Sequence, residues 1–316
     1  MELIPILPDL EAPREHVEKY KGRLAIGGNF HVQILDNGKA QGTGTNEYGQ
    51  CNVGKWKNLV SLSAGYAHIL ALDKDGKAFA TGFDPDNRCK MGGWKDLQAV
   101  CAGWDHSLGL KKDGTVLAKG HILDGRLEVD TWTDVVQICA GSDYSLGLRS
   151  DGTVLATGAN YDGQCEVGNW KDIVRLYSGG FHTLGLRKDG TVLATGVSSE
   201  GQCDVEDWTQ IIDLAVGENF TLGLREDGTV LATGGGLDDR CQVSDWDNIV
   251  AIAAGKSHSV GLRVDGTVVA RGYNEDGRCD VGHWEEVVAI FAAFEHTVGI
   301  KADGTVLFAG PVEVDS

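Results

Sequence analysis

Tryptophan recurs every 38 residues in this chain without interruption. The seven regularly spaced tryptophans are Trp56, Trp94, Trp132, Trp170, Trp208, Trp246 and Trp284. Eight glycines keep the same spacing, namely Gly38, Gly76, Gly114, Gly152, Gly190, Gly228, Gly266 and Gly304. A period of about 20–50 residues indicates one small structural unit repeated along the chain, each copy burying its apolar faces against its neighbours. We therefore predict a single repeat domain over residues 1–316.

One repeat, residues 249–284, contains four strand-length runs, IVAIAAG, HSVGLR, TVVARG and RCDVGHW. Each run is β-branched or alternating in polarity, and glycine-containing turns bound it. The Asp-Gly pair between the second and third runs is typical of a two-residue hairpin. It recurs at Asp113, Asp151, Asp189 and Asp227, and Asn37 replaces the aspartate in the first copy. Repeated four-stranded units without helical periodicity are typical of a β-propeller.

The number of copies predicts the number of blades. The hairpin half of the repeat occurs eight times, but the tryptophan run occurs only seven times. We therefore expect an all-β fold, a single closed propeller of eight four-stranded blades. Residues 21–310 would form the repeats, and a strand from the N-terminal residues 1–20 would complete the last blade. Seven blades with a spare hairpin is the alternative.

Alternating strand directions place the turns on two faces. The Asp-Gly hairpins would open on one face, and the AGxxH turns and the loops after TVLATG on the other. The first run of each repeat is rich in small residues, which suits a crowded position next to the central axis.

The consensus AGxxHxxGLxxDGTVxAxGxNxxGQCxVxxW resembles the repeat of the regulator of chromosome condensation family, in its compact bacterial form. The resemblance covers about residues 10–310. It implies a propeller whose common role is to bind another protein on one face. Propellers of that family usually have seven blades, so a count of eight departs from the pattern.

Composition restricts the partners. The formal net charge of −18 disfavours nucleic acid, because phosphate backbones would be repelled. No run approaches the length of about 20 apolar residues that spans a membrane, and the N-terminus lacks the pattern of a secretion signal. Eight cysteines without a CxxC pair predict free thiols in a reducing compartment and no metal site. We therefore expect a cytoplasmic monomer without cofactors.

Positions that repeat serve the blade. His68, His106, His182, His258 and His296 share one column, in which Phe30, Tyr144 and Phe220 also occur. This column therefore needs an aromatic side chain, and we expect each histidine to be structural, with one ring nitrogen hydrogen-bonded to the backbone. The regular tryptophans are expected to wedge between blades.

Positions that vary are available for recognition. The two residues before the histidine column, together with the loops after the third run, are rich in aromatic and acidic residues, the composition of a protein-binding hot spot. The candidate partner-binding residues are Tyr66, Trp104, Asp105, Asp143, Phe181, Glu218, Asn219, Lys256, Phe294, Glu295, Tyr48, Phe83, Tyr161 and Tyr273. The alternative is an ordinary solvated loop face.

A third set of polar residues belongs to the first run of each repeat. Its candidates are Arg23, Gln137, Arg175 and Asp213. They could line a channel that holds a small ligand, or they could form hydrogen bonds between blades. We favour the hydrogen bonds between blades.

These patterns predict a non-catalytic protein that binds a protein partner through the AGxxH face, as an inhibitor or adaptor. No catalytic constellation stands apart from the repeat, so we expect no enzyme. A protein that sequesters a small molecule or nucleotide in the channel is the alternative, and a structural scaffold comes third.

Overall fold

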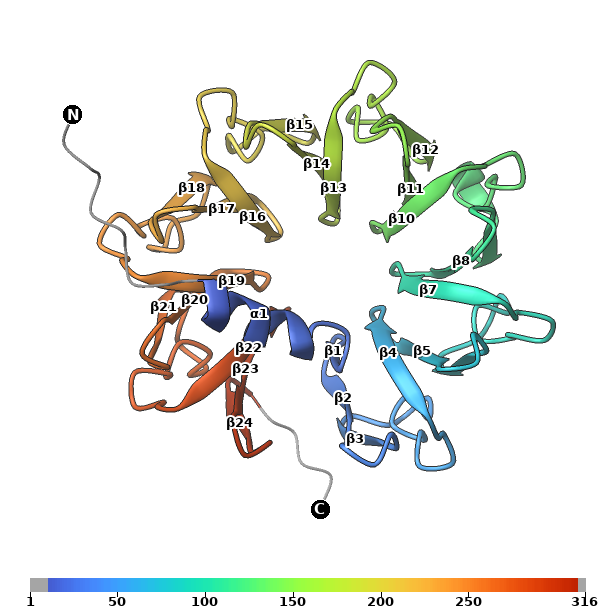
Figure 1. Ribbon diagram of the computed structural model, residues 1–316, viewed down its shortest axis with the longest axis horizontal. Coiled ribbons are helices and arrows are strands. Elements are labelled where there is room, and N and C mark those ends of the chain that lie inside the picture. The colour runs from blue at the N-terminus through green and yellow to red at the C-terminus, as the bar shows by residue number, and fades with distance from the viewer. Residues whose placement is uncertain (1–10, 312–316) are drawn as a thin grey trace.

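Eight similar sheets surround a central opening in the computed structural model, which describes residues 11–311 (Figure 1). Each sheet has three antiparallel strands in chain order. The first four sheets are β1 (Leu24–Ile26), β2 (Phe30–Ile34) and β3 (Ala40–Gly44); β4 (Leu59–Ala64), β5 (His68–Asp73) and β6 (Ala78–Gly82); β7 (Leu97–Ala102), β8 (His106–Lys111) and β9 (Val116–Gly120); β10 (Val135–Ala140), β11 (Tyr144–Arg149) and β12 (Val154–Gly158).

The next four sheets repeat this arrangement. They are β13 (Ile173–Ser178), β14 (His182–Arg187) and β15 (Val192–Gly196); β16 (Ile211–Val216), β17 (Phe220–Arg225) and β18 (Val230–Gly234); β19 (Ile249–Ala254), β20 (His258–Arg263) and β21 (Val268–Gly272); β22 (Val287–Ala293), β23 (His296–Lys301) and β24 (Val306–Ala309). A helix, α1 (Glu11–Tyr20), precedes the first sheet, and a short 3-10 turn, η1 (Leu123–Gly125), follows the third.

The prediction of four-stranded blades is wrong, because the tryptophan-bearing run forms turns instead of a strand. In residues 83–96 the backbone donors of Lys90, Met91 and Trp94 bond to carbonyls two or three residues earlier. Because these backbone bonds are local, this segment does not pair with the third strand of the sheet. Residues with positive φ, such as Asn87 (φ 68°) and Asp96 (φ 59°), also interrupt the extended conformation.

The predicted N-terminal closing strand is also wrong. Residues 11–20 form α1, and residues 1–10 lie outside the described part of the chain. The segment EAPREHVEKY is rich in good helix formers. The eighth sheet takes all three strands from residues 287–309, so within residues 11–311 no sheet combines N-terminal and C-terminal strands.

The count of eight agrees with the eight sheets, and the seven-blade alternative is wrong. The first and eighth sheets lie side by side and meet through side chains: Leu24 joins an apolar cluster with Val298 and Ile300, and the rings of His31 and Phe308 lie 4.4 Å apart.

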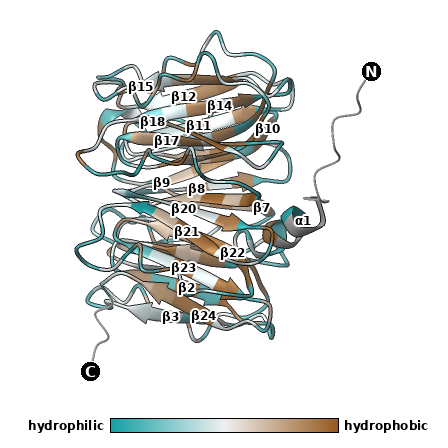
Figure 2. Cartoon of the chain, turned by 90° about the vertical axis from the view of Figure 1, so that its left-hand side faces the viewer, coloured by the Kyte–Doolittle hydropathy of each residue, from teal (hydrophilic) through white to brown (hydrophobic). Residues whose placement is uncertain are grey.

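Helix α1 lies on the hairpin face, which we define as the face carrying the Asp-Gly turns; the opposite face is the AG-turn face. The Arg14 guanidinium donates to the carbonyl oxygen of Glu226 in a hairpin turn (3.1 Å), and Val17 is buried against the seventh and eighth sheets. Figure 2 shows the helix projecting from one face of the ring. Among the described residues, no helix is long and apolar enough to cross a membrane.

The regular tryptophans are buried between consecutive sheets, as predicted. Trp132 follows the third sheet and packs with Val135 and Leu108 in one apolar cluster. Its ring faces Gly147 in the middle of β11, where a Cβ would stand 2.9 Å from two ring carbons. The same contact joins Trp94 to Gly109 and recurs at four further junctions, whereas Ala71 occupies the glycine column in the second sheet.

We expect Gly147→Ala to lower the free energy of unfolding by about 1–3 kcal/mol, because the added methyl group overlaps the rigid indole of Trp132. Gly168→Ala is the control, since a Cβ there has no atom within 4 Å. Urea denaturation monitored by circular dichroism measures both. Equal stability of the two variants would show that the indole does not press on the strand.

Candidate partner-binding site at the mouth of the central opening

The AG turns of all eight sheets surround one end of the central opening. Six of the eight innermost strands end in alanine or serine, whereas β1 ends at Ile26 and β16 at Val216. The turn that follows closes with a backbone bond such as Gly65 N to the His68 carbonyl (2.9 Å). The variable residues of the turns therefore converge on a cavity of about 630 Å³, which we call the mouth. The structure thus confirms the predicted placement of the first strands around the centre.

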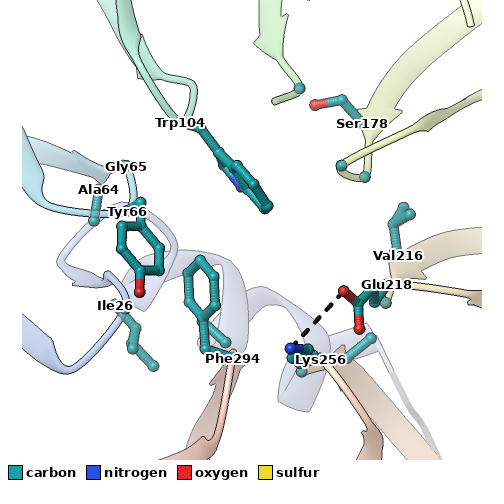
Figure 3. Close-up of a pocket in the computed structure, with 18 of the residues that line it drawn as sticks. Ile26, Ala64, Gly65, Tyr66, Trp104, Ser178, Val216, Glu218, Lys256 and Phe294 are labelled. Carbon is teal, nitrogen blue, oxygen red and sulfur yellow. Dashed lines mark ion pairs between the residues drawn. The ribbon is translucent and has the colours of Figure 1, made fainter. Parts of the chain in front are cut away.

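Four aromatic side chains form a continuous arc on one side of the mouth, and Figure 3 shows Tyr66, Trp104 and Phe294 of this set. The ring centroids are 5.4 Å apart for Phe294 and Tyr66, 6.2 Å for Tyr66 and Trp104, and 6.1 Å for Trp104 and Phe181. Tyr66 and Trp104 remain 55% and 40% exposed. We call these four residues the aromatic arc. Rings that are held by one another but still open to solvent can anchor a partner at little entropic cost.

An ion pair also lines the mouth. The Lys256 ammonium lies 3.9 Å from the Glu218 carboxylate (Figure 3). Both side chains are well exposed, so the pair contributes little to stability and can be rearranged by a partner.

The acidic turn residues have a different role from the one predicted. Asp105 is 2.5 Å from the Arg88 guanidinium, and Asp143 is 2.8 Å from that of Arg126. Glu295 lies 3.9 Å from Arg278. These three arginines are only 3% exposed. The acidic residues therefore neutralise buried charges, and a partner cannot use them without uncovering an arginine.

Sequence reasoning missed these arginines, although the repeat contains the signal. Their column holds Gln50, Arg88, Arg126, Gln164, Gln202, Arg240 and Arg278. Arginine occurs in the three copies whose following AG turn carries an acidic second residue, and glutamine occurs where that residue is alanine, phenylalanine or asparagine. Arg240 is the one exception.

The predicted outer-loop aromatics do not form one cluster. Tyr48 and Phe83 pack together with centroids 4.7 Å apart. Tyr161 is 83% exposed, and its hydroxyl donates to Asp124 (2.9 Å). Tyr273 follows the seventh sheet and donates to Glu275 (2.7 Å), and its ring centroid lies 4.9 Å from the Arg278 guanidinium carbon. Asn219 lies beside the mouth, but its side chain does not line it. Exposed Ile122, Leu123 and Leu237 on the same loops were not selected from the sequence.

The four channel candidates do not converge on a ligand site. Arg23 bonds to Asp36 (3.0 Å). Gln137 spans two sheets, donating to the Leu176 carbonyl (2.8 Å) and accepting from the Leu176 amide (2.9 Å). The Gln137 bonds favour the interpretation as contacts between blades, whereas Arg23 bonds within its own sheet.

The remaining two candidates, Arg175 and Asp213, hold helix α1. Asp213 accepts from Lys21 (3.2 Å) and from the Tyr177 hydroxyl (2.5 Å), and Arg175 lies 3.7 Å from Asp213. Burial and the adjacent Asp213 carboxylate raise the pKa of Tyr177, so its hydroxyl stays a donor. This network fastens the helix at the hairpin end of the opening.

The histidine column is structural, but its partner is not the predicted backbone group. His68 Nε2 meets the Ser107 hydroxyl of the next sheet (3.1 Å), and His106 meets Ser145 (3.0 Å). Each hydroxyl in turn donates to the carbonyl oxygen of a buried arginine, as Ser107 does to Arg88 (2.9 Å). Burial lowers the pKa of His68 to about 4 and that of His106 to about 3, so both rings are neutral at pH 7.

The repeat of this chain is also found in known proteins. The sequence profile of the regulator of chromosome condensation (RCC1) repeat matches residues 135–164, 173–202 and 249–278. The chain therefore contains RCC1 repeats. In a search of curated proteins, nothing matches.

Several solved structures have a similar fold. Prp20p from Saccharomyces cerevisiae, described with its binding to Gsp1p and histones, has a TM-score of 0.61 at 16% identity, covering 99% of this chain and 97% of the yeast chain. The ectodomain of the Arabidopsis thaliana receptor kinase ACR4 has a TM-score of 0.62 at 18% identity, covering 82% of this chain and 97% of its own. Human WBSCR16 has a TM-score of 0.55 at 18% identity, covering 91% and 86%. At these identities the likeness concerns the fold.

We expect the RCC1-repeat protein to lose stability as the pH falls from about 6.5 towards 3. The folded pKa values of the buried histidines lie below that of an unfolded chain, so the unfolded state binds protons that the folded state does not. His106→Phe, which uses the residue found at Phe30 and Phe220, should flatten this slope by up to about 1.4 kcal/mol per pH unit.

Urea denaturation at a series of pH values measures this slope. His283→Gln, at an exposed position, is the control and should leave it unchanged. An unchanged slope in His106→Phe would mean that this ring is not held neutral by burial.

Proposed function

We propose that this RCC1-repeat protein is a non-catalytic binding protein that recognises a protein partner through the mouth and the neighbouring loops of the AG-turn face. The aromatic arc is the observation that carries the proposal. It presents two well-exposed rings at a concave site, and apolar aromatic surface of this kind is enriched at the centres of protein interfaces.

The exposed apolar residues extend the arc outward over one sector of the ring. The pair of Tyr48 and Phe83 lies on the loops after the first and second sheets, and Ile122, Leu123 and Tyr161 follow on the loops after the third and fourth. A partner seated on this sector could cover several loops as well as the arc. The net charge of −18 favours a partner of basic or mixed charge, which the field would steer towards the surface.

The related fold of Prp20p is known to serve in binding proteins, namely Gsp1p and histones. This supports a protein partner over a small ligand. The groups expected to hold a small ligand in the channel are engaged in contacts between sheets and with α1, so the sequestering role lacks support from their geometry.

A cytoplasmic location forms part of the proposal. All eight cysteines are free in the structure. Burial raises the pKa of Cys89 to about 12 and that of Cys165 to about 11. These thiols therefore stay protonated at pH 7 and resist oxidation, because the thiolate is the reactive form, and they behave as apolar packing groups.

We expect Tyr66→Ala combined with Trp104→Ala to abolish capture of the partner, because truncating a hot-spot anchor costs about 2 kcal/mol or more. Tagged wild-type protein and the variant are compared by quantitative mass spectrometry of the proteins captured from the source cells. The affinity for the purified partner is then measured by calorimetry.

The control for this experiment is Val60→Ala combined with Val174→Ala. These side chains are equally exposed, at 50% and 47%, but lie at the hairpin ends of their strands. The control should bind like the wild type. Identical partner sets for the wild type and the aromatic variant would refute the proposal.

A further inference from the structure

Arg240 breaks the pairing rule that the other buried arginines follow. Arg88, Arg126 and Arg278 each have two acidic partners, one two residues earlier in the loop and one in the next AG turn. Arg240 has the first, Asp238, whose carboxylate accepts from Nε (2.6 Å) and Nη2 (2.5 Å). The second acidic position holds Ser257.

The backbone of Arg240 has the same position in its repeat as the backbones of Arg88, Arg126 and Arg278 have in theirs. Its carbonyl oxygen accepts from the Ser259 hydroxyl (2.7 Å), just as that of Arg88 accepts from Ser107 (2.9 Å). A Cβ on Gly272 would contact both the Ser257 carbonyl and Arg240 Cβ, so the two residues are neighbours. The missing carboxylate is therefore a local substitution and not a consequence of a shifted loop.

The guanidinium of Arg240 has a single acidic ion-pair partner among residues 11–311. Within this range no hydrogen bond or ion pair engages its Nη1, whereas Nη1 of Arg88 and of Arg126 each contact a turn aspartate, and Arg278 meets its turn acid through Nη2. The Arg240 guanidinium also lies over the Phe220 ring, 5.7 Å from its centroid. Arg240 is 8% exposed, against 3% for the other three arginines. It is thus nearly buried, charged and incompletely neutralised, which is an unfavourable state for an arginine.

Other charges around Arg240 do not replace the missing carboxylate. Glu218 attracts the guanidinium from a distance, but its closest cationic contact is with Lys256 at 3.9 Å. The Lys256 ammonium belongs to the same turn as Ser257 and is well exposed at the mouth. The backbone of Gly236 packs closely against the guanidinium, because a Cβ there would stand 2.7 Å from Arg240 Nε, and the adjacent Leu237 is fully exposed.

We infer that Arg240 and Lys256 form a carboxylate-binding site at the edge of the mouth, which a carboxylate of the protein partner fills in place of the acidic residue absent at position 257. The inference rests on the proposed function for the identity of the ligand. The site chemistry is that of the three internal pairs, in which a carboxylate lies against Nη1 or Nη2 of a buried arginine. Phe294 lines the mouth together with Lys256, and the exposed Leu237 belongs to the same loop as Arg240.

The site can be tested on the isolated protein with acetate as the probe. In protein labelled with ¹⁵N-arginine, the Nε–H resonance of Arg240, assigned from its loss in Arg240→Gln, is followed during titration with sodium acetate at constant ionic strength. We expect a saturable shift at millimolar acetate. Arg240→Gln is a suitable variant because the repeat itself uses glutamine in this column at Gln50, Gln164 and Gln202.

Two substitutions at the turn decide between a site and a nonspecific effect. Ser257→Asp supplies the missing acid internally and should weaken the response of Arg240 at least tenfold without lowering the melting temperature. Asp105→Ser removes the acid from a paired copy and should create a second responding resonance, that of Arg88. An Arg240 resonance that ignores acetate, or one that responds equally in Ser257→Asp, would overturn the inference.

The source of the carboxylate is distinguished by two further probes. N-acetylglycine presents the carboxylate of a chain terminus, and the α-amide of N-acetylaspartate presents that of an aspartate side chain. The probe that binds more tightly identifies which kind of carboxylate the site takes. Trp104→Ala should leave the acetate response unchanged. If acetate does not shift the Arg240 resonance while partner capture stays intact, only the carboxylate site is rejected. A loss of partner capture would leave the conclusion about the carboxylate site unchanged.

Discussion

The structure depends on the contact between each regular tryptophan and the sheet that follows it. At six of the seven regular tryptophans the indole packs directly on a glycine of the facing strand, as Trp132 and Gly147 show, and Trp56 faces Ala71 instead. Backbone bonds from the first strand of each sheet to the preceding hairpin glycine, such as Val135 N to the Gly114 carbonyl (3.1 Å), fix the same junction at its outer end. Each sheet is small and buries its faces only against its neighbours, so stability resides between the sheets. The junction of the eighth and first sheets uses aliphatic packing around Leu24 instead.

This arrangement separates folding from recognition. The wedge, the hairpin and the buried histidine occupy constant columns, whereas the AG turns only have to close between two strands. Two variable residues per turn can therefore change without affecting the junctions, and eight turns bring them together at one mouth. The arginine column couples the two roles, because a buried arginine is tolerated only where a carboxylate can reach it. That coupling explains why the acidic turn residues vary together with the preceding loop, and why the exception at Arg240 is informative.

The repeat predicted the eight units, the central position of the first strand, the two faces and the tryptophan wedges, because these follow from periodicity. It did not predict that the run ending in Trp94 forms turns, since its alternating polarity imitates a strand while its local hydrogen bonds are invisible in sequence. The repeat count favours a strand before the first sheet, to supply the missing fourth strand of the last blade. Residues 11–20 form a helix instead, because their local helix propensity does not depend on the repeat. At the site, the convergence of Tyr66, Trp104, Phe181 and Phe294 could be predicted from their column. The arginine pairs required comparing two columns at once.

A double-mutant cycle between Trp132 and Gly147 tests the central claim most directly. The free energy of unfolding is measured for the wild type, Gly147→Ala, Trp132→Leu and the combined variant. If the indole is what the glycine accommodates, the added methyl group should cost little once the ring is gone, and the coupling energy should be at least about 1 kcal/mol. Costs that add to within about 0.5 kcal/mol would show that the two positions act independently, which would contradict the wedge as the interaction that joins the sheets.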